Sequence, residues 1–136
     1  MSEITNDKAQ MTNQVQNLKD KKFDLANRTT ILGENIILFA SQIKTGPITN
    51  PIINQIVRSG TSIGANYMEA DGADTKKDFI YKIGICKRES KETLHWLRMV
   101  AIACPDLVIQ ARILWKEVHE LVLIFSTIIR NSKLKH

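Results

Sequence analysis

The feature that most constrains the fold is the spacing of apolar residues, which recur at alternating steps of three and four in separate stretches of this 136-residue chain. Such spacing is typical of one face of an α-helix and differs from the strict alternation of a strand. The row nearest the C-terminus is Leu107, Ala111, Leu114, Val118, Leu121, Phe125 and Ile128. The preceding row is Phe79, Ile83, Cys86, Ser90, Thr93, Leu97 and Val100. The period predicts an all-α protein.

Three helix-breaking segments divide these stretches. They are Thr45-Gly46-Pro47 through Asn50-Pro51, Asp71-Gly72-Ala73-Asp74, and Cys104-Pro105-Asp106. We expect Gly46 to close a helix in the left-handed conformation, and Asn50, Thr75 and Asp106 to cap the helices that follow. The predicted helices span about 21–44, 51–70, 75–103 and 107–131. Short connections between them predict an antiparallel up-down-up-down four-helix bundle.

The two ends of the chain are polar. Residues 1–20 are either a polar arm or an extension of the first helix, and residues 132–136 form a basic tail. The N-terminus lacks the apolar core of a signal peptide, and no apolar run approaches the roughly 20 residues that cross a bilayer. We therefore expect a cytoplasmic protein without membrane contact. Cys86 and Cys104 lie on one predicted helix and are expected to stay reduced, since about 27 Å of helix separates them.

The apolar faces are wider than one subunit needs. The first helix carries two rows, Phe23, Ala26, Thr30, Gly33, Ile37 and Ala40, and beside them Leu32, Ile36, Phe39 and Ile43. The fourth helix adds Val108, Trp115, Val122 and Ile129. These extra residues either deepen the core or are buried against another copy. Because a large exposed apolar patch is unusual on a monomer, we favour a homo-oligomer.

A polar ladder runs along the second predicted helix beside small residues such as Gly60 and Gly64. Its members share one side of the helix and are Arg58, Ser62, Asn66 and Glu69. One interpretation is a binding surface. The other, which we favour, is a polar network that determines register or the interface between subunits.

This segment, Gln55 to Ala70, also carries a family resemblance. Together with Lys76–Ile83 and Lys87–Leu97, it resembles the bacterial four-helix-bundle family named for members encoded in intervening sequences of large-subunit ribosomal RNA genes. The resemblance covers roughly Phe23 to Arg130 and implies an antiparallel bundle that assembles into a ring, commonly a pentamer. It implies no established activity and no catalytic residues. A role in RNA handling is inferred for the family from genomic location and from basic relatives that assist reverse transcriptases.

No pattern of residues indicates an enzyme, a metal or a cofactor. Glu92-x-x-His95 matches half of a di-iron motif, but the fourth helix has Glu117-x-x-Glu120 and lacks the second histidine. No phosphate-binding loop, zinc spacing or nucleophile elbow occurs. We predict no catalytic residues, no metal ligands and no cofactor.

The formal net charge of +5 and the pI near 9.3 favour an acidic partner. Candidate nucleic-acid-binding residues lie on the third helix and near the C-terminus: Lys77, Lys87, Arg88, Lys91, Arg98, Arg130, Lys133 and Lys135. An ordinary solvated surface would also alternate lysine and glutamate, as Glu89 and Glu92 do here. Our hypothesis is a non-enzymatic homo-oligomer that binds nucleic acid, with RNA favoured over DNA. The alternative is a protein–protein adaptor that binds no nucleic acid.

Overall fold

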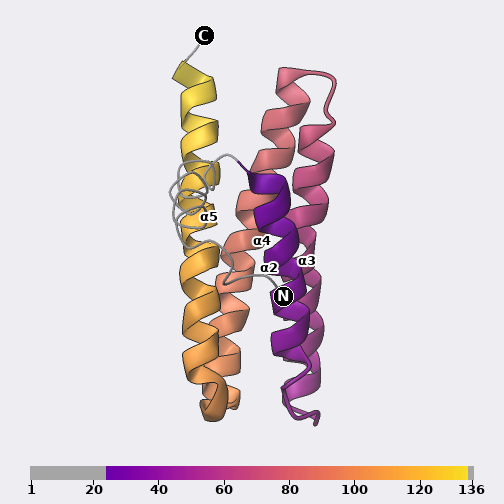
Figure 1. Ribbon diagram of the computed structural model, residues 1–136, viewed down its shortest axis with the longest axis vertical. Coiled ribbons are helices and arrows are strands. Elements are labelled where there is room, and N and C mark those ends of the chain that lie inside the picture. Colours follow the sequence, from indigo (N-terminus) through magenta and orange to yellow (C-terminus); the bar gives the residue numbers. More distant parts are fainter. Residues whose placement is uncertain (1–23, 135–136) are drawn as a thin grey trace, which may run out of the picture.

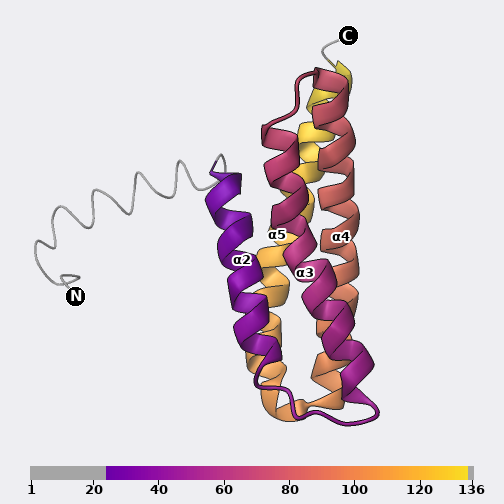
Figure 2. The ribbon, with the colours of Figure 1, turned by 90° about the vertical axis from the view of Figure 1, so that its right-hand side faces the viewer.

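Each apolar stretch between the helix-breaking segments forms one helix. The structure is a computed structural model that describes residues 24–134 (Figure 1). Its elements are α2 (Leu25–Ala40), α3 (Thr49–Asp71), α4 (Lys76–Ala103), the 3-10 turn η1 (Pro105–Leu107) and α5 (Val108–Leu134). Consecutive helices run in opposite directions (Figures 1 and 2). The predicted all-α, antiparallel four-helix bundle is confirmed.

The connection between α2 and α3 differs from the prediction. α2 ends at Ala40 instead of residue 44, where the Ser41 N–H donates to the Ile37 carbonyl. Gly46 is not left-handed. Side chains close the turn instead: the Thr49 hydroxyl donates to the Lys44 carbonyl at 2.6 Å, and the Asn50 side-chain oxygen accepts from the Gly46 N–H at 3.1 Å. α3 starts at Thr49, ahead of the expected residue 51, so Asn50 lies inside the helix and is not its cap. Residues 1–20 and 21–23 lie outside the described residues.

The later helix starts follow from their caps. The Thr75 hydroxyl accepts a hydrogen bond from the Asp78 N–H at 3.0 Å, as expected of an N-cap. Asp106 does not cap α5 from outside, because Pro105–Leu107 form a 3-10 turn before Val108. α5 continues through Lys133 to Leu134, so the expected basic tail from residue 132 begins inside the helix.

The core comes from one face of each helix. On α4 and α5 the expected rows are buried or half-buried along their length. On α2 the core row is the second one, Leu32, Ile36, Phe39 and Ile43, whereas Ile37 of the first row is 50% exposed. Both rows cannot face inward because α2 packs chiefly on α3, and a helix buries one stripe of about 100° against such a neighbour.

The four helices do not pack against their neighbours to the same extent. α2 packs on α3, α3 on α4 and α4 on α5, whereas α2 has only a narrow seam with α5. Figure 2 shows that α2 is the short helix of the bundle; it has 16 residues against 27 in α5. Apolar side chains beside this seam remain exposed: Ile31, Leu38, Ile109 and Ile113. Among the described residues, no helix is long and apolar enough to span a membrane.

Candidate nucleic-acid interface

The polar ladder of α3 faces α4. Arg58 donates through Nη1 to Glu89 at 3.1 Å and pairs through Nη2 with Glu92. The Trp96 indole N–H also donates to Glu92 at 3.1 Å, and this bond, together with Arg58, holds the pKa of the Glu92 carboxyl below its usual value. Arg58 of α3 therefore balances the charge of both Glu89 and Glu92, which lie near the middle of α4.

The remaining ladder residues divide into two kinds. Glu69 pairs with Lys82 of α4. Ser62 and Asn66 instead bond to their own helix: the Ser62 hydroxyl donates to the Arg58 carbonyl at 2.6 Å, and the Asn66 amide donates to the Ser62 carbonyl at 2.8 Å. Arg58 and Glu69 thus link α3 to α4, and the structure brings Ser62 and Asn66 to no partner on another described helix.

A second ion-pair cluster joins α2 to α5. Arg28 makes a two-bond contact with Glu117, at 2.8 and 2.9 Å, and its Nη2 lies 2.7 Å from Glu120. The Arg28 side chain is 5% exposed, and Glu117 is the first cause of its raised pKa. This ion-pair cluster was not predicted from the sequence. Its signal was a cation set between Leu25 and Leu32 on the buried row of α2.

The two ion-pair clusters involve the glutamates of α4 and α5. Beyond its first turn, α4 has two acidic residues, Glu89 and Glu92, and α5 has Glu117 and Glu120. Arg58 draws the first pair toward α3, and Arg28 draws the second pair toward α2. All four glutamates are therefore engaged by arginines of the neighbouring helices α2 and α3.

The predicted cations lie along the flank where α4 meets α5. Lys87, Lys91 and Arg98 are spaced by four and seven residues, so they form one row on α4. Arg98 contributes to the boundary with α5, which places the row on that side. Within residues 24–134 none of the three forms an ion pair. The row is available for an anionic partner.

The other predicted cations extend this flank. Lys77 and Arg88 are exposed on α4, in a row with the exposed His95. Arg130 and Lys133 are exposed on the last turns of α5, which run antiparallel to the first turns of α4 (Figure 1). Lys135 lies outside the described residues. Arg112 was not predicted from the sequence; it is exposed on α5 and lies at the boundary with α4.

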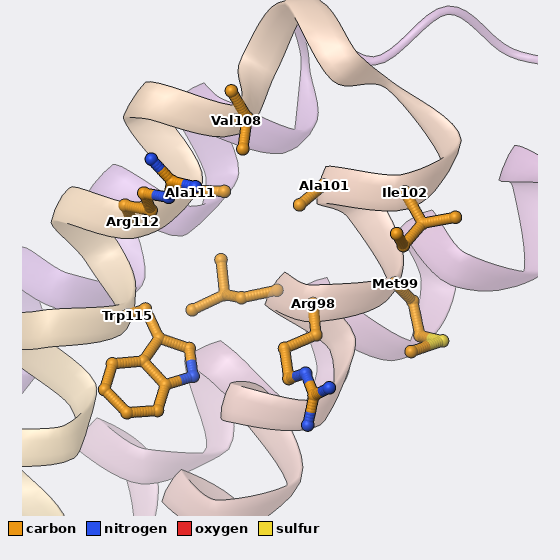
Figure 3. A pocket seen from close by; sticks show the side chains of 9 residues that line it. Arg98, Met99, Ala101, Ile102, Val108, Ala111, Arg112 and Trp115 are labelled. Carbon is orange, nitrogen blue, oxygen red and sulfur yellow. The ribbon is translucent and has the colours of Figure 1, made fainter.

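A shallow groove of about 530 Å³ lies between α4 and α5 near the α4–α5 turn. Figure 3 shows Arg98 and Met99 on one side and Arg112 and Trp115 on the other. The Trp115 indole stacks on the His119 imidazole, with ring centroids 4.8 Å apart and an interplanar angle of 13°. Among the predicted site residues that the structure describes, Arg98 alone borders this groove. Trp115 was predicted as part of the apolar face of the fourth helix, not as a site residue.

The carboxylates considered for a di-iron site lie apart. Glu92 belongs to the α3–α4 pair and Glu117 to the α2–α5 pair, while His95 is exposed. Among the residues that the structure describes, no group of three or more His, Cys, Asp or Glu side chains could hold a metal ion. These carboxylates serve as partners of arginine.

The fold and this flank define the class of protein: an antiparallel four-helix bundle with a cationic outer side. Residues 21–104 match the family described as 23S rRNA-intervening sequence protein, and the chain belongs to that family. The match covers α2, α3 and α4 and confirms the resemblance seen in the sequence.

A crystal structure of similar fold is known from Bacteroides thetaiotaomicron. It is a protein of unknown function from the S23 ribosomal protein family, 27% identical to this chain, with a TM-score of 0.69. The likeness covers 81% of this chain and 98% of that chain. No curated protein matches the sequence.

Proposed function

We propose that this protein is a non-enzymatic, homo-oligomeric accessory factor that binds RNA through the outer flank of α4 and α5. The observation that carries the proposal is the separation of basic from acidic residues on α4. Lys87, Lys91 and Arg98 form a row without acidic neighbours, because Arg58 engages Glu89 and Glu92 on the opposite flank. A row of unpaired cations binds phosphates, whereas alternating charges would repel and attract them equally.

RNA is the favoured nucleic acid because of the family. The family's description refers to a 23S rRNA intervening sequence, and nucleic-acid partners fit the net charge of +5. Phosphate contacts of this kind carry little sequence information. We therefore expect binding that depends strongly on salt and weakly on sequence.

Self-association is the second part of the proposal, with a pentamer favoured from the family resemblance. Leu38 and Ile113 are 63% and 64% exposed, and both lie between the two cross-links that join α2 to α5, the Arg28 ion pairs and the Gln110–Gln42 hydrogen bond. Exposed apolar side chains gathered along one seam are typical of an interface. A ring of identical subunits would also multiply a weak cationic row through avidity.

Fluorescence anisotropy with labelled RNA tests the binding. Lys91→Ala and Arg98→Ala are each expected to lower the slope of log affinity against log salt by about one, since each removes one phosphate contact. Lys44→Ala, an exposed cation in the α2–α3 connection, is the matched control and leaves the slope unchanged.

Light scattering on the full chain tests the assembly, and the expected mass is several times 15.4 kDa. A single-subunit mass in dilute solution contradicts self-association. Absence of any RNA binding at micromolar protein and moderate salt contradicts the nucleic-acid function. Recovery of a protein partner after nuclease treatment would then favour the adaptor.

A further inference from the structure

The groove between α4 and α5 combines an apolar floor with two cations. Leu97, Ala101 and Ala111 contribute apolar surface, and Arg98 and Arg112 stand at its border (Figure 3). None of the nine lining residues is acidic. Its volume of about 530 Å³ falls within the range of roughly 300–1,000 Å³ that is usual for ligand sites. The groove is complementary to a flat apolar group that carries negative charge beside it.

Trp115 supplies the aromatic surface for such a group. Its indole lines the groove and is held by the parallel stack with His119, one turn further along α5. A ring fixed in this way loses little conformational freedom when a second ring stacks against it. Proteins that bind single-stranded nucleic acids without sequence preference combine aromatic side chains, on which bases stack, with cations that contact the phosphates.

We propose that this groove holds an unpaired base of single-stranded RNA against Trp115, with the flanking phosphates at Arg98 and Arg112. The inference rests on the proposed RNA-binding function and adds the class of RNA. A duplex keeps its bases paired and stacked, so it reaches the cationic row but cannot fill the groove. The chain thus prefers RNA with unpaired nucleotides.

The test uses the full chain and a labelled oligouridine of twelve nucleotides, compared with an RNA duplex of the same length. Trp115→Leu is expected to weaken oligouridine binding roughly tenfold, in line with the loss of one stacked base, and to leave duplex binding unchanged. Trp115→Phe retains a ring and most of the affinity. Tyr81→Leu is the matched control, because Tyr81 is an exposed aromatic residue of α4 that does not line the groove, and it leaves both affinities unchanged.

Two further measurements guard against a folding defect. Arg112 is exposed, so Arg112→Ala keeps the fold and is expected to weaken oligouridine binding. In the Trp96→Phe protein, Trp115 is the remaining tryptophan, and its fluorescence is expected to be quenched by oligouridine and unchanged by the duplex.

The outcomes separate the two proposals. Equal binding of oligouridine and duplex, both insensitive to Trp115→Leu, overturns the groove assignment and leaves the RNA-binding function in place. Absence of binding to either RNA overturns the function itself. Tighter binding of oligodeoxythymidine than oligouridine, or quenching of Trp115 by polyglutamate instead of RNA, also overturns the assignment of single-stranded RNA to the groove.

Discussion

At the scale of single residues, burial decides how the two cysteines behave. Cys86 lies in the core of α4, with its sulfur 3.6 Å from the Ile63 carbonyl, and burial raises the pKa of its thiol to about 12. Cys104 is half-buried at the end of the same helix. Both thiols are free, as expected from their separation along α4.

A thiol-reactive dye should therefore distinguish them. At pH 8 a thiol with a pKa of about 12 is ionised to only about one part in ten thousand, and burial also blocks access. We expect Ellman's reagent to modify Cys104 rapidly in the folded protein and Cys86 only when the protein unfolds. The Cys104→Ala variant isolates the slow thiol. Rapid labelling of Cys86 in that variant would contradict the buried position.

The two arginines that form ion pairs, Arg58 and Arg28, also differ in burial. Arg58 has a side chain that is 45% exposed, so its pairs with Glu89 and Glu92 are screened by solvent. Arg28 is buried, and among the described residues its Nη1 atom has no hydrogen-bond partner. Because a buried guanidinium depends on its carboxylates, Arg28 is the arginine whose partners affect stability.

At the scale of elements, the contact between α2 and α3 depends on the absence of side chains. A Cβ atom at Gly60 would lie 2.8 Å from the Cγ2 of Ile36, and one at Gly64 would lie 3.2 Å from the Thr29 carbonyl oxygen. The small residues of the family motif therefore let α2 approach α3, while Ser59 on the neighbouring face places its hydroxyl 3.0 Å from that of Thr93 on α4.

Two glycine-to-alanine substitutions test this packing. Gly60→Ala forces Ile36, which is fully buried, to move at its branch point, and we expect the free energy of unfolding to fall by about 1–3 kcal/mol. Gly84→Ala on α4 meets nothing within 4 Å, so it should raise that free energy by about 0.5–1 kcal/mol through helix propensity. Urea unfolding measures both. Equal effects of the same sign would contradict the close contact.

At the scale of the whole molecule, α2 is the least embedded helix, and the buried Arg28 joins it to α5 through an ion pair with the partly exposed Glu117. Glu117 makes the two-bond contact with Arg28, whereas the Glu120 side chain is 57% exposed and makes one contact. The same arrangement keeps both carboxylates away from the cationic flank of α4 and α5. Stability and charge distribution are therefore linked through Arg28.

Removing the charge of Glu117 should weaken the contact between α2 and α5. We expect Glu117→Gln to lower the free energy of unfolding by about 1.5–3 kcal/mol, because a buried guanidinium loses its main partner. Glu120→Gln, at an exposed position, should cost less than about 1 kcal/mol. The exposed Glu34→Gln on α2 is the control and should change little. An effect of Glu120→Gln as large as that of Glu117→Gln would show that the two-bond contact is not the link.

Much of the fold could be predicted from local patterns. The period of three and four reports which face of a helix is buried, and the caps and prolines report where helices begin, because both depend on residues within one or two turns. The rows of α4 and α5 and the Thr75 cap were predicted for this reason. Local pattern did not identify which of the two apolar rows of α2 is buried, since that depends on the helix it packs against.

Pairing across helices was decided only by the tertiary structure. Glu92 and Glu117 looked like half of a metal site or like ordinary surface charge until their positions beside Arg58 and Arg28 were known. The groove that joins Arg98 to Trp115 likewise arises from the register of α4 against α5. Helix formation follows from neighbours in sequence, whereas register and crossing depend on how whole side-chain surfaces interlock. The sequence by itself therefore determined the helices and the buried faces of α4 and α5, and the tertiary structure alone decided which row of α2 is buried and how the charges are distributed.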